Sequence, residues 1–202
     1  MKRKILTKPF FARKTLIVAK ELLGKYLVRH YRGKEIVSML TEVEAYDGFL
    51  DKASHAHRGK TNRNQIMFGE AGCFYINFTY GIHWLVNIVT DKKDYPAAVL
   101  LRGVEAVNGP ARLTKYFKID KQFNGKDATP ETGLWFEDRG VKISSSKIKC
   151  LPRIGVDYAG EIWAMKPYRF ILSLPKTKNQ PTPSRSNPHP QHLSLSRISL
   201  LV

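Results

Sequence analysis

The spacing of apolar side chains predicts the first half of the fold. Apolar residues recur near a 3.6-residue period over 9–24 and Gly24 follows them, which predicts a helix that ends at this glycine. Two runs rich in β-branched and aromatic residues come next, at 25–31 and 35–46, with Arg-Gly-Lys between them. They predict two strands joined by a tight turn.

The second half of the chain continues this mixture of elements. Residues 47–71 are polar and irregular, so a long loop is expected there, and loops of this length in compact domains often carry function. A helix is expected over 110–116, with proline in its first turn. Further strands are expected at 74–90, as one strand or a pair, at 97–106, and around Trp135 and Phe170.

These elements favour a single α+β domain over residues 1–174, with a curved, mainly antiparallel β-sheet and surrounding helices. From residue 175 the composition shifts to Pro, Ser, Asn, Gln and Lys, which cannot bury enough apolar area to offset the entropy of ordering. We expect 175–202 to be a disordered tail. Its last ten residues alternate like a strand, without an evident pairing partner.

Composition narrows the setting in which the chain works. Its 202 residues include only two cysteines, Cys73 and Cys150, which fits a reduced compartment and is too few for a structural zinc site. No apolar run approaches eighteen residues, and the basic opening lacks an apolar segment behind it. We therefore expect a cytoplasmic protein that does not enter the membrane, associated with the nucleoid if the cell is bacterial.

The net charge of +17, from 34 Lys and Arg against 17 Asp and Glu, changes the picture most. It could simply keep the surface solvated. Such an imbalance also destabilises the compact state by self-repulsion, which a polyanionic partner would offset. Nucleic acid is the favoured partner. An anionic membrane surface is the weaker alternative, because no basic amphipathic helix stands out.

One short segment suggests chemistry. Alternation through 37–46 places Glu42, Glu44 and Tyr46 on the same face of a strand. A glutamate on an apolar, aromatic face is desolvated, which raises its pKa and suits it to take a proton from water. Glu44 could instead form a structural ion pair with Arg102. The same arginine could also hold a water molecule beside the carboxylate.

Aromatic and histidine side chains lie close to this segment in the sequence. Tyr46, His55 and Tyr80 fit a site for a nucleobase, since stacking on a flat side chain is worth about 1–3 kcal/mol per base. Each of them is weak evidence alone, because strand tyrosines are usually core residues. His55 and His57 are two residues apart and no helical His/Glu pair accompanies them, so no metal ligand set is expected.

Many short motifs in one order resemble the alkyladenine (3-methyladenine) DNA glycosylases of the animal and Bacillus type. The resemblance runs from about residue 10 to residue 172. Its motifs are Glu42-Val-Glu-Ala-Tyr46, Ala53-Ser-His55, Arg63-Asn64, Met67-Phe68, Gly72-Cys-Phe-Tyr75, Tyr80-Gly81, Asn87, Leu100-Leu-Arg102, Asn108-Gly-Pro110, Arg153-Ile-Gly-Val, Ala159-Gly-Glu161 and Lys166-Pro-Tyr-Arg-Phe170.

The resemblance implies a monofunctional DNA glycosylase that flips damaged purines out of double-stranded DNA and hydrolyses the glycosidic bond. The implied lesions are 3-methyladenine, 7-methylguanine, hypoxanthine and ethenoadenine, and the enzyme would be a monomer without a cofactor. Glu44 would be the general base. Arg102 and the backbone carbonyl of Ile154 would help to hold the water, while Tyr46 and His55 would pack against the flipped base.

Three further residues receive roles from the resemblance. Tyr80 would enter the duplex in place of the flipped nucleotide, and Asn87 would crowd the exocyclic amino group of guanine. Asn77 departs from the family pattern, which has a tyrosine that stacks on the flipped base at this position. Because Asn77 cannot stack on the base, we expect weaker capture of neutral lesions, unless Tyr75 or Phe78 takes the place of the missing aromatic ring.

Two other classes remain open at this level. A non-catalytic basic DNA- or RNA-binding protein could use the same aromatic residues as stacking platforms. An inward carboxylate at Glu44 would however repel its ligand. A hydrolase of free nucleosides would have no use for a charge of +17.

Overall fold

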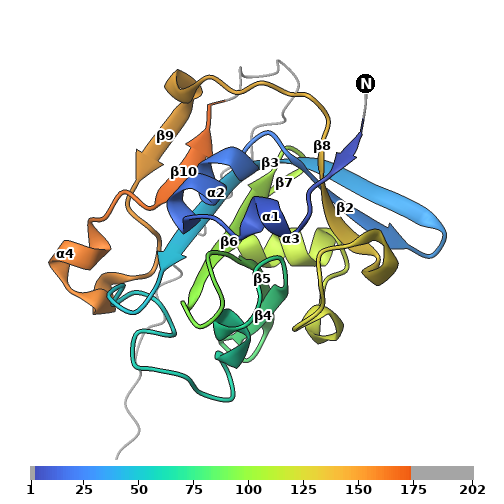
Figure 1. Cartoon of the computed structure of the whole chain (residues 1–202). Helices are drawn as coiled ribbons and strands as arrows, with labels where there is room; N and C mark the ends of the chain where they lie inside the picture. Colours follow the sequence, from blue (N-terminus) through green and yellow to red (C-terminus); the bar gives the residue numbers. More distant parts are fainter. Residues whose placement is uncertain (1–2, 174–202) are drawn as a thin grey trace, which may run out of the picture.

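The computed structural model describes residues 3–173, and its core is a sheet crossed by short helices (Figure 1). The elements in chain order are β1 (Lys4–Ile5), α1 (Lys8–Phe11), α2 (Thr15–Leu22), β2 (Tyr26–Tyr31), β3 (Lys34–Asp47), β4 (Phe74–Thr79), β5 (His83–Val89), β6 (Ala97–Val104), β7 (Val107–Asn108), α3 (Pro110–Tyr116), β8 (Leu134–Asp138), β9 (Ile148–Leu151), α4 (Glu161–Ala164) and β10 (Arg169–Leu172). Short 3₁₀ helices lie at Gln65–Phe68, Lys121–Phe123, Pro130–Thr132, Ser145–Lys147 and Asp157–Ala159.

The long strand β3 organises the sheet. The main strand order is β1-β8-β2-β3-β6-β5-β4; in addition, β10 pairs with β3, β9 with β10, and β7 with β6. Every one of these pairs is antiparallel, which confirms the predicted α+β fold with a mainly antiparallel sheet. The first half of β3 pairs with β2, and its second half lies between β6 and β10. Residues 42–44 are therefore in the interior of the sheet.

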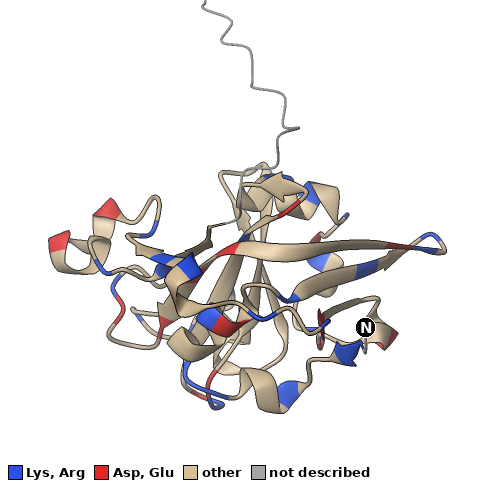
Figure 2. Ribbon diagram, turned by 90° about the horizontal axis from the view of Figure 1, so that it is seen from above, with Lys and Arg blue, Asp and Glu red and all other residues tan. Residues whose placement is uncertain are grey.

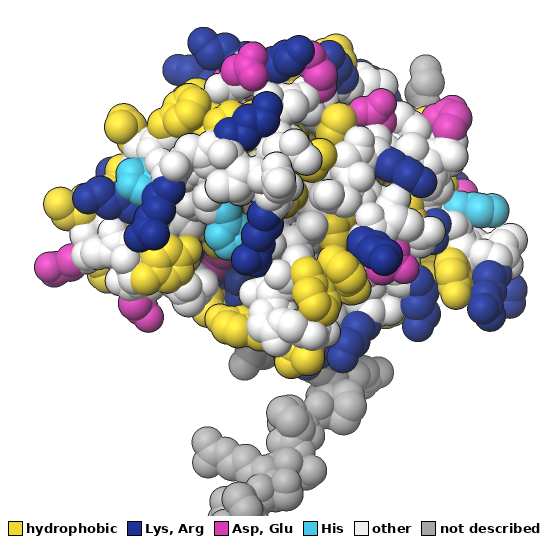
Figure 3. All heavy atoms as spheres, turned by 90° about the horizontal axis from the view of Figure 1, so that it is seen from below, with side chains coloured by type: hydrophobic (Ala, Val, Ile, Leu, Met, Phe, Trp, Pro, Cys, Tyr) yellow, Lys and Arg dark blue, Asp and Glu magenta, His cyan; other side chains and the backbone are white. Residues whose placement is uncertain are grey.

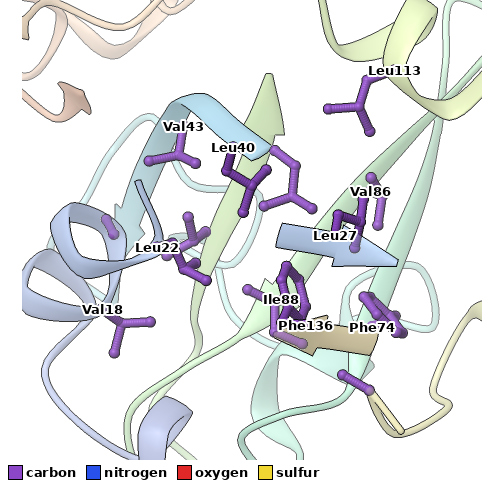
Figure 4. Close-up of a cluster of buried hydrophobic side chains, with 14 of the residues drawn as sticks. Val18, Leu22, Leu27, Leu40, Val43, Phe74, Val86, Ile88, Leu113 and Phe136 are labelled. Atoms are coloured by element: carbon purple, nitrogen blue, oxygen red, sulfur yellow. The ribbon is translucent and has the colours of Figure 1, made fainter. Parts of the chain in front are cut away.

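Alternation in β3, β4, β5 and β6 sends every second side chain into one hydrophobic core (Figure 4). Helix α2 covers this face beside β3 and β6, with Val18, Ala19 and Leu22 buried. Phe136 from β8 stacks on Phe74 with ring centroids 5.9 Å apart. The core side chains of the four strands are Met39, Leu40, Val43, Ala45, Phe74, Ile76, Val86, Ile88, Val99, Leu101 and Val104.

The prediction of one continuous helix over 9–24 is wrong. The structure has two helices there, α1 and α2, with a break between them. The backbone N–H of Asp91 donates to the carbonyl groups of Phe11 and Arg13, at 3.1 Å each. A continuous helix would use these carbonyls internally. A tertiary contact with the end of β5 has therefore replaced part of the helical pattern.

Most other predicted elements are confirmed. Residues 74–90 form the hairpin of β4 and β5, and the predicted helix at 110–116 has the bounds of α3, with proline in its first turn. The segment between β3 and β4 is a loop with one 3₁₀ helix at Gln65–Phe68. The pattern of apolar and polar residues did not predict strand β9 or helix α4. The predicted tail, 175–202, lies outside the described residues.

Positive charge is distributed over the whole ribbon rather than gathered in one element (Figure 2). This distribution matches the sequence, in which Lys and Arg recur from one end to the other. Over residues 3–173, none of the helices has the length and apolar character needed to cross a membrane.

Candidate active site

The polar face of the same strands forms one wall of a cavity of about 370 Å³. The side chains that alternate with the core residues point into it, so the period of two that builds the core also builds the site. The strand residues that line it are Tyr46, Tyr75, Asn77, Thr79, His83, Leu85, Asn87, Leu100 and Arg102. The other lining residues come from loops, short helices and the β4–β5 turn: Ala53, His55, Met67, Tyr80, Pro110, Ala111, Ile154, Gly155, Val156 and Tyr158.

Glu44 lies directly behind this wall and is completely buried. Its Oε1 accepts the backbone N–H of Ile154 at 2.9 Å and forms an ion pair with Arg102 Nη1 at 3.3 Å. Its Oε2 accepts the hydroxyl of Tyr46 at 3.0 Å. All three neighbours line the cavity. A carboxylate has about four acceptor positions, so three donors leave room for one more, such as a water molecule.

Burial raises the pKa of Glu44 above the ordinary carboxyl value, against the opposing effects of Arg102, the Ile154 N–H and Tyr46. A raised pKa makes a carboxylate a stronger base, provided that it remains ionised at the working pH. Burial also raises the pKa of Tyr46, and the adjacent Glu44 adds to this effect, so the tyrosine keeps its proton and donates it to Glu44.

Tyr46 is held from behind by a buried ion pair. The guanidinium of Arg153 lies 4.8 Å from the centre of the Tyr46 ring and donates to the carbonyl of Ala45 at 2.9 Å. Asp51 accepts both terminal nitrogens of Arg153, and neither side chain is exposed. This pair connects the loop after β3 to the segment that carries Ile154.

Arg102 contacts two carboxylates rather than one. Its Nε donates to Glu42 Oε1 at 3.0 Å, while its Nη1 faces Glu44. The ion pair expected between Glu44 and Arg102 is therefore present, and Arg102 forms a shorter contact with Glu42 in addition. Arg102 is left between Glu42, Glu44 and the cavity.

His55 is placed by the loop between β3 and β4. Its carbonyl accepts Nδ2 of Asn64 at 2.9 Å, and its ring Nδ1 lies 3.4 Å from the hydroxyl of Tyr75. Burial lowers the pKa of His55, and the charge of Arg63 lowers it further. The imidazole is therefore neutral at neutral pH, which suits a side chain that packs against a base.

Two asparagines face the cavity from the β4–β5 hairpin with fixed amide orientations. Asn77 Oδ1 accepts Arg63 Nε at 3.1 Å and Nη2 at 2.9 Å. Since arginine has only donors, the NH₂ group of Asn77 must point the other way. Asn87 Nδ2 donates to the carbonyl of Tyr75 at 3.1 Å, which leaves its oxygen free to face the cavity. The bonds to Asn77 occupy two of the nitrogens of Arg63.

Tyr80 stands at the tip of the same hairpin and is 88% exposed. Tyr80 and Gly81 have φ of 51° and 67°, as in the turns that match the twist of two-residue hairpins. Positive φ is rare for a bulky residue and costs about 1–2 kcal/mol. A strained, exposed tyrosine at the mouth of a cavity indicates a functional role. Ile82 beside it is also exposed.

All eight predicted site residues therefore lie at or directly behind one cavity, although their roles remain proposals. Asp51 and Arg153 were missed as a pair because they are 102 residues apart and no spacing rule connects them. The contact of Arg63 with Asn77 was missed for the same reason. The only available signal was that the loop after β3 carries a carboxylate, Asp51, in a chain with few of them.

The face around the loop between β3 and β4 carries exposed basic side chains. Figure 3 views the molecule from below, where the loop between β3 and β4 lies in Figure 1, and Lys and Arg side chains are spread there among exposed hydrophobic and His side chains. A buried carboxylate behind a cavity, within a basic surface, is the arrangement expected of a hydrolytic enzyme that acts on nucleic acid.

Comparison with known proteins identifies the family. The model of the family described as "Methylpurine-DNA glycosylase (MPG)" matches this chain over residues 9–108 and 104–175. Relatives named "Putative 3-methyladenine DNA glycosylase" include one from Methanocella arvoryzae, 39% identical over 91% of this chain and 98% of the relative. Others come from Carboxydothermus hydrogenoformans (38%, covering 83% and 95%) and Legionella pneumophila strain Corby (39%, covering 83% and 93%).

The chain therefore belongs to the methylpurine-DNA glycosylase family. It is a DNA glycosylase, a hydrolase of N-glycosidic bonds, and its substrate is DNA.

The buried pair of Asp51 and Arg153 generates a prediction about stability. Asp51→Ala leaves the Arg153 guanidinium buried without its partner, so the free energy of unfolding should fall by about 3–5 kcal/mol in urea denaturation. Glu70→Ala, which removes the exposed partner of Lys8, is the control and should leave the midpoint unchanged. Equal midpoints for the two variants would show that the buried pair does not stabilise the fold.

Proposed function

We propose that this protein is a monofunctional, monomeric glycosylase that removes alkylated and deaminated purines from double-stranded DNA in base-excision repair. Its lesions would be 3-methyladenine, 7-methylguanine, hypoxanthine and ethenoadenine, and it would act in the cytoplasm, on the nucleoid in a bacterial cell. One observation carries the proposal: Glu44 is fully buried behind the cavity wall and contacts Tyr46, Arg102 and Ile154, which all line the cavity.

The chemical step follows from this arrangement. A water molecule between Glu44 and Arg102 attacks C1′ of the flipped nucleotide as the C1′–N9 bond breaks. Glu44 takes the proton of the water, and the electrons of the broken bond go to the departing base. A cationic base such as 3-methyladenine leaves as a neutral molecule, whereas hypoxanthine leaves as an anion that takes a proton from solvent. The described residues that line the cavity include no lysine, which supports attack by water rather than by an amine.

The cavity walls supply the binding energy for the flipped base. Tyr46 is rigid because its hydroxyl is bonded to Glu44 and its ring packs on Arg153, so it can offer a fixed flat surface. His55 is neutral and does not repel a cationic base. Asn87 projects from the middle of β5, where its fixed amide would crowd the amino group of guanine.

Tyr80 would fill the space that the flipped nucleotide leaves in the duplex. Extrusion costs a few kcal/mol in lost stacking and pairing, and an inserted aromatic side chain offsets part of this cost. The exposure of Tyr80 and its position at the end of a hairpin support this role. The exposed Ile82 lies on the same turn.

Substitution of Glu44 tests the proposal directly. Glu44→Gln keeps the shape and an oxygen that can accept the Ile154 N–H, but it cannot take a proton. Single-turnover base release from duplex oligonucleotides with hypoxanthine, and from methylated DNA, should fall by about 10³-fold or more, while DNA binding measured by fluorescence anisotropy is retained.

The wild type sets the reference for this measurement. If it releases no base from either DNA but binds both tightly, the protein is a DNA-binding member of the family without this activity. If the Gln variant retains wild-type rates, Glu44 is not the base.

The lesion range depends on Asn77. Without an aromatic wall at this position, hypoxanthine and ethenoadenine should react more slowly than 3-methyladenine, whose glycosidic bond is already weakened by its charge. Asn77→Tyr should raise the single-turnover rate on hypoxanthine relative to 3-methyladenine by about 5-fold to 100-fold, equivalent to about 1–3 kcal/mol of stacking. Asn77→Leu also removes the acceptor of Arg63 but adds no ring, and is the matched control. Comparable wild-type rates on all three lesions would contradict the expectation.

The strained turn predicts opposite effects on activity and stability at Tyr80. Asparagine tolerates positive φ, so Tyr80→Asn should leave the free energy of unfolding unchanged or raise it by up to about 1 kcal/mol. Base release from duplex DNA should fall by at least 10-fold, because the wedge is lost. A variant that is less stable and fully active would show that Tyr80 serves the fold alone.

A further inference from the structure

A second carboxylate, Glu42, stands at the centre of the polar contacts around Glu44. It is 6% exposed, and its Oε1 accepts Arg102 Nε at 3.0 Å and Arg169 Nη1 at 3.2 Å. Glu42 does not line the cavity. It therefore acts on the cavity only through Arg102, which lines it.

The contacts of Glu42 close into a ring. Arg169 donates through Nε to the carbonyl of Pro152 at 2.8 Å, which fixes the segment that continues to Ile154. Ile154 donates its N–H to Glu44, and Glu44 pairs with Arg102. Glu42 is thus connected to Glu44 by two routes, one through Arg102 and one through Arg169 and the backbone of residues 152–154.

The strands on both sides of β3 bring the two arginines to Glu42. At residues 42–44 the strand β3 lies between β6 and β10, which supply Arg102 and Arg169 respectively. The pairing of β3 with β6 is irregular on both sides of Glu42. Gly103 faces Glu42, and a Cβ on Gly103 would lie 3.2 Å from the Cβ of Glu42, tighter than most such contacts. A glycine at this position gives the Glu42 side chain the room that it occupies.

The charges around Glu44 balance only if Glu42 is counted. Arg102 and Arg169 bring two positive charges, and Glu42 and Glu44 bring two negative charges. Arg153 is already neutralised by Asp51. The charged or titratable side chains around Glu44 are Glu42 and Tyr46 from β3, Arg102 from β6, Arg169 from β10, and Arg153, Asp51 and Tyr158 from the loops.

We propose that Glu42 is a positioning residue: it shares Arg102 with Glu44 and also pairs with Arg169, and so it limits how strongly positive charge stabilises the ionised form of Glu44. Without Glu42, Arg102 would be balanced by Glu44 alone, and Arg169 would lose its carboxylate partner. This inference rests on the proposed function, in which Glu44 takes a proton from water. It assigns to Glu42 a role in the strength of the base and none in binding DNA.

The sign of the effect follows from electrostatics. Glu42→Gln removes a negative charge near Glu44, so the pKa of Glu44 should fall by about one unit. The acid limb of the pH–rate profile, where Glu44 must be ionised, should shift to lower pH by the same amount. The rate on the plateau should decrease by at most about 10-fold, because a weaker base abstracts the proton less readily. Arg169→Gln removes a positive charge and should shift the acid limb to higher pH.

The experiment compares single-turnover rates on hypoxanthine-containing duplex DNA as a function of pH for the wild type, Glu42→Gln, Glu42→Asp and Arg169→Gln. The aspartate variant keeps the charge and should restore the wild-type acid limb. Glu137→Gln is the matched control: Glu137 is also buried and held by an arginine, Arg139, but it lies on β8 away from the cavity. It should affect stability without moving the limb.

Opposite shifts in the Gln variants at positions 42 and 169 would support the inference, since loss of structure alone would not move the profile in two directions. Unchanged limbs, with rates reduced equally at every pH, would overturn it and leave Glu42 a structural residue. If Glu42→Gln does not fold, Arg169→Gln decides the question alone.

A ¹³C-NMR titration of the Glu44 carboxyl in the same variants measures the pKa without any reaction. It separates failure of this inference from failure of the proposed function. An inactive wild type in which the pKa of Glu44 still shifts as expected would contradict only the proposed function.

Discussion

A carboxylate with no access to solvent must be stabilised by the protein around it, and Glu44 imposes this requirement on its surroundings. Donors come from its own strand, from the neighbouring strand β6 and from the loop that carries Ile154. The arginines that take part are themselves paired, with Glu42 and with Asp51. Most of the buried charged groups on this side of the sheet therefore belong to the network of ion pairs around this one carboxylate.

The same requirement explains how a protein of charge +17 can hold carboxylates near DNA. An exposed glutamate in a groove for phosphates would repel the ligand. Glu42, Glu44 and Asp51 are all buried, and each contacts at least one guanidinium group. Their charges are neutralised locally, so the basic surface remains the field that an approaching polyanion meets.

How much the sequence predicts depends on whether a feature is local. Period-two alternation in β3 places Glu42, Glu44 and Tyr46 on one face, and proline predicts the start of α3, because both effects act within a few residues. The break between α1 and α2 could not be predicted, since it depends on a backbone contact with Asp91. The pairing of Arg153 with Asp51 and of Arg169 with Glu42 likewise depends on how distant segments meet.

The position of β10 has a consequence for how the protein is made. This strand completes the sheet beside Glu44, and it ends at Leu172, close to the end of the described chain. During synthesis from the N-terminus, β3 and β6 emerge long before β10 and the loop that donates the Ile154 N–H. A chain that lacks β10 and this loop also lacks the strand beside Glu44 and the N–H of Ile154, so the buried arrangement around Glu44 requires nearly the whole domain.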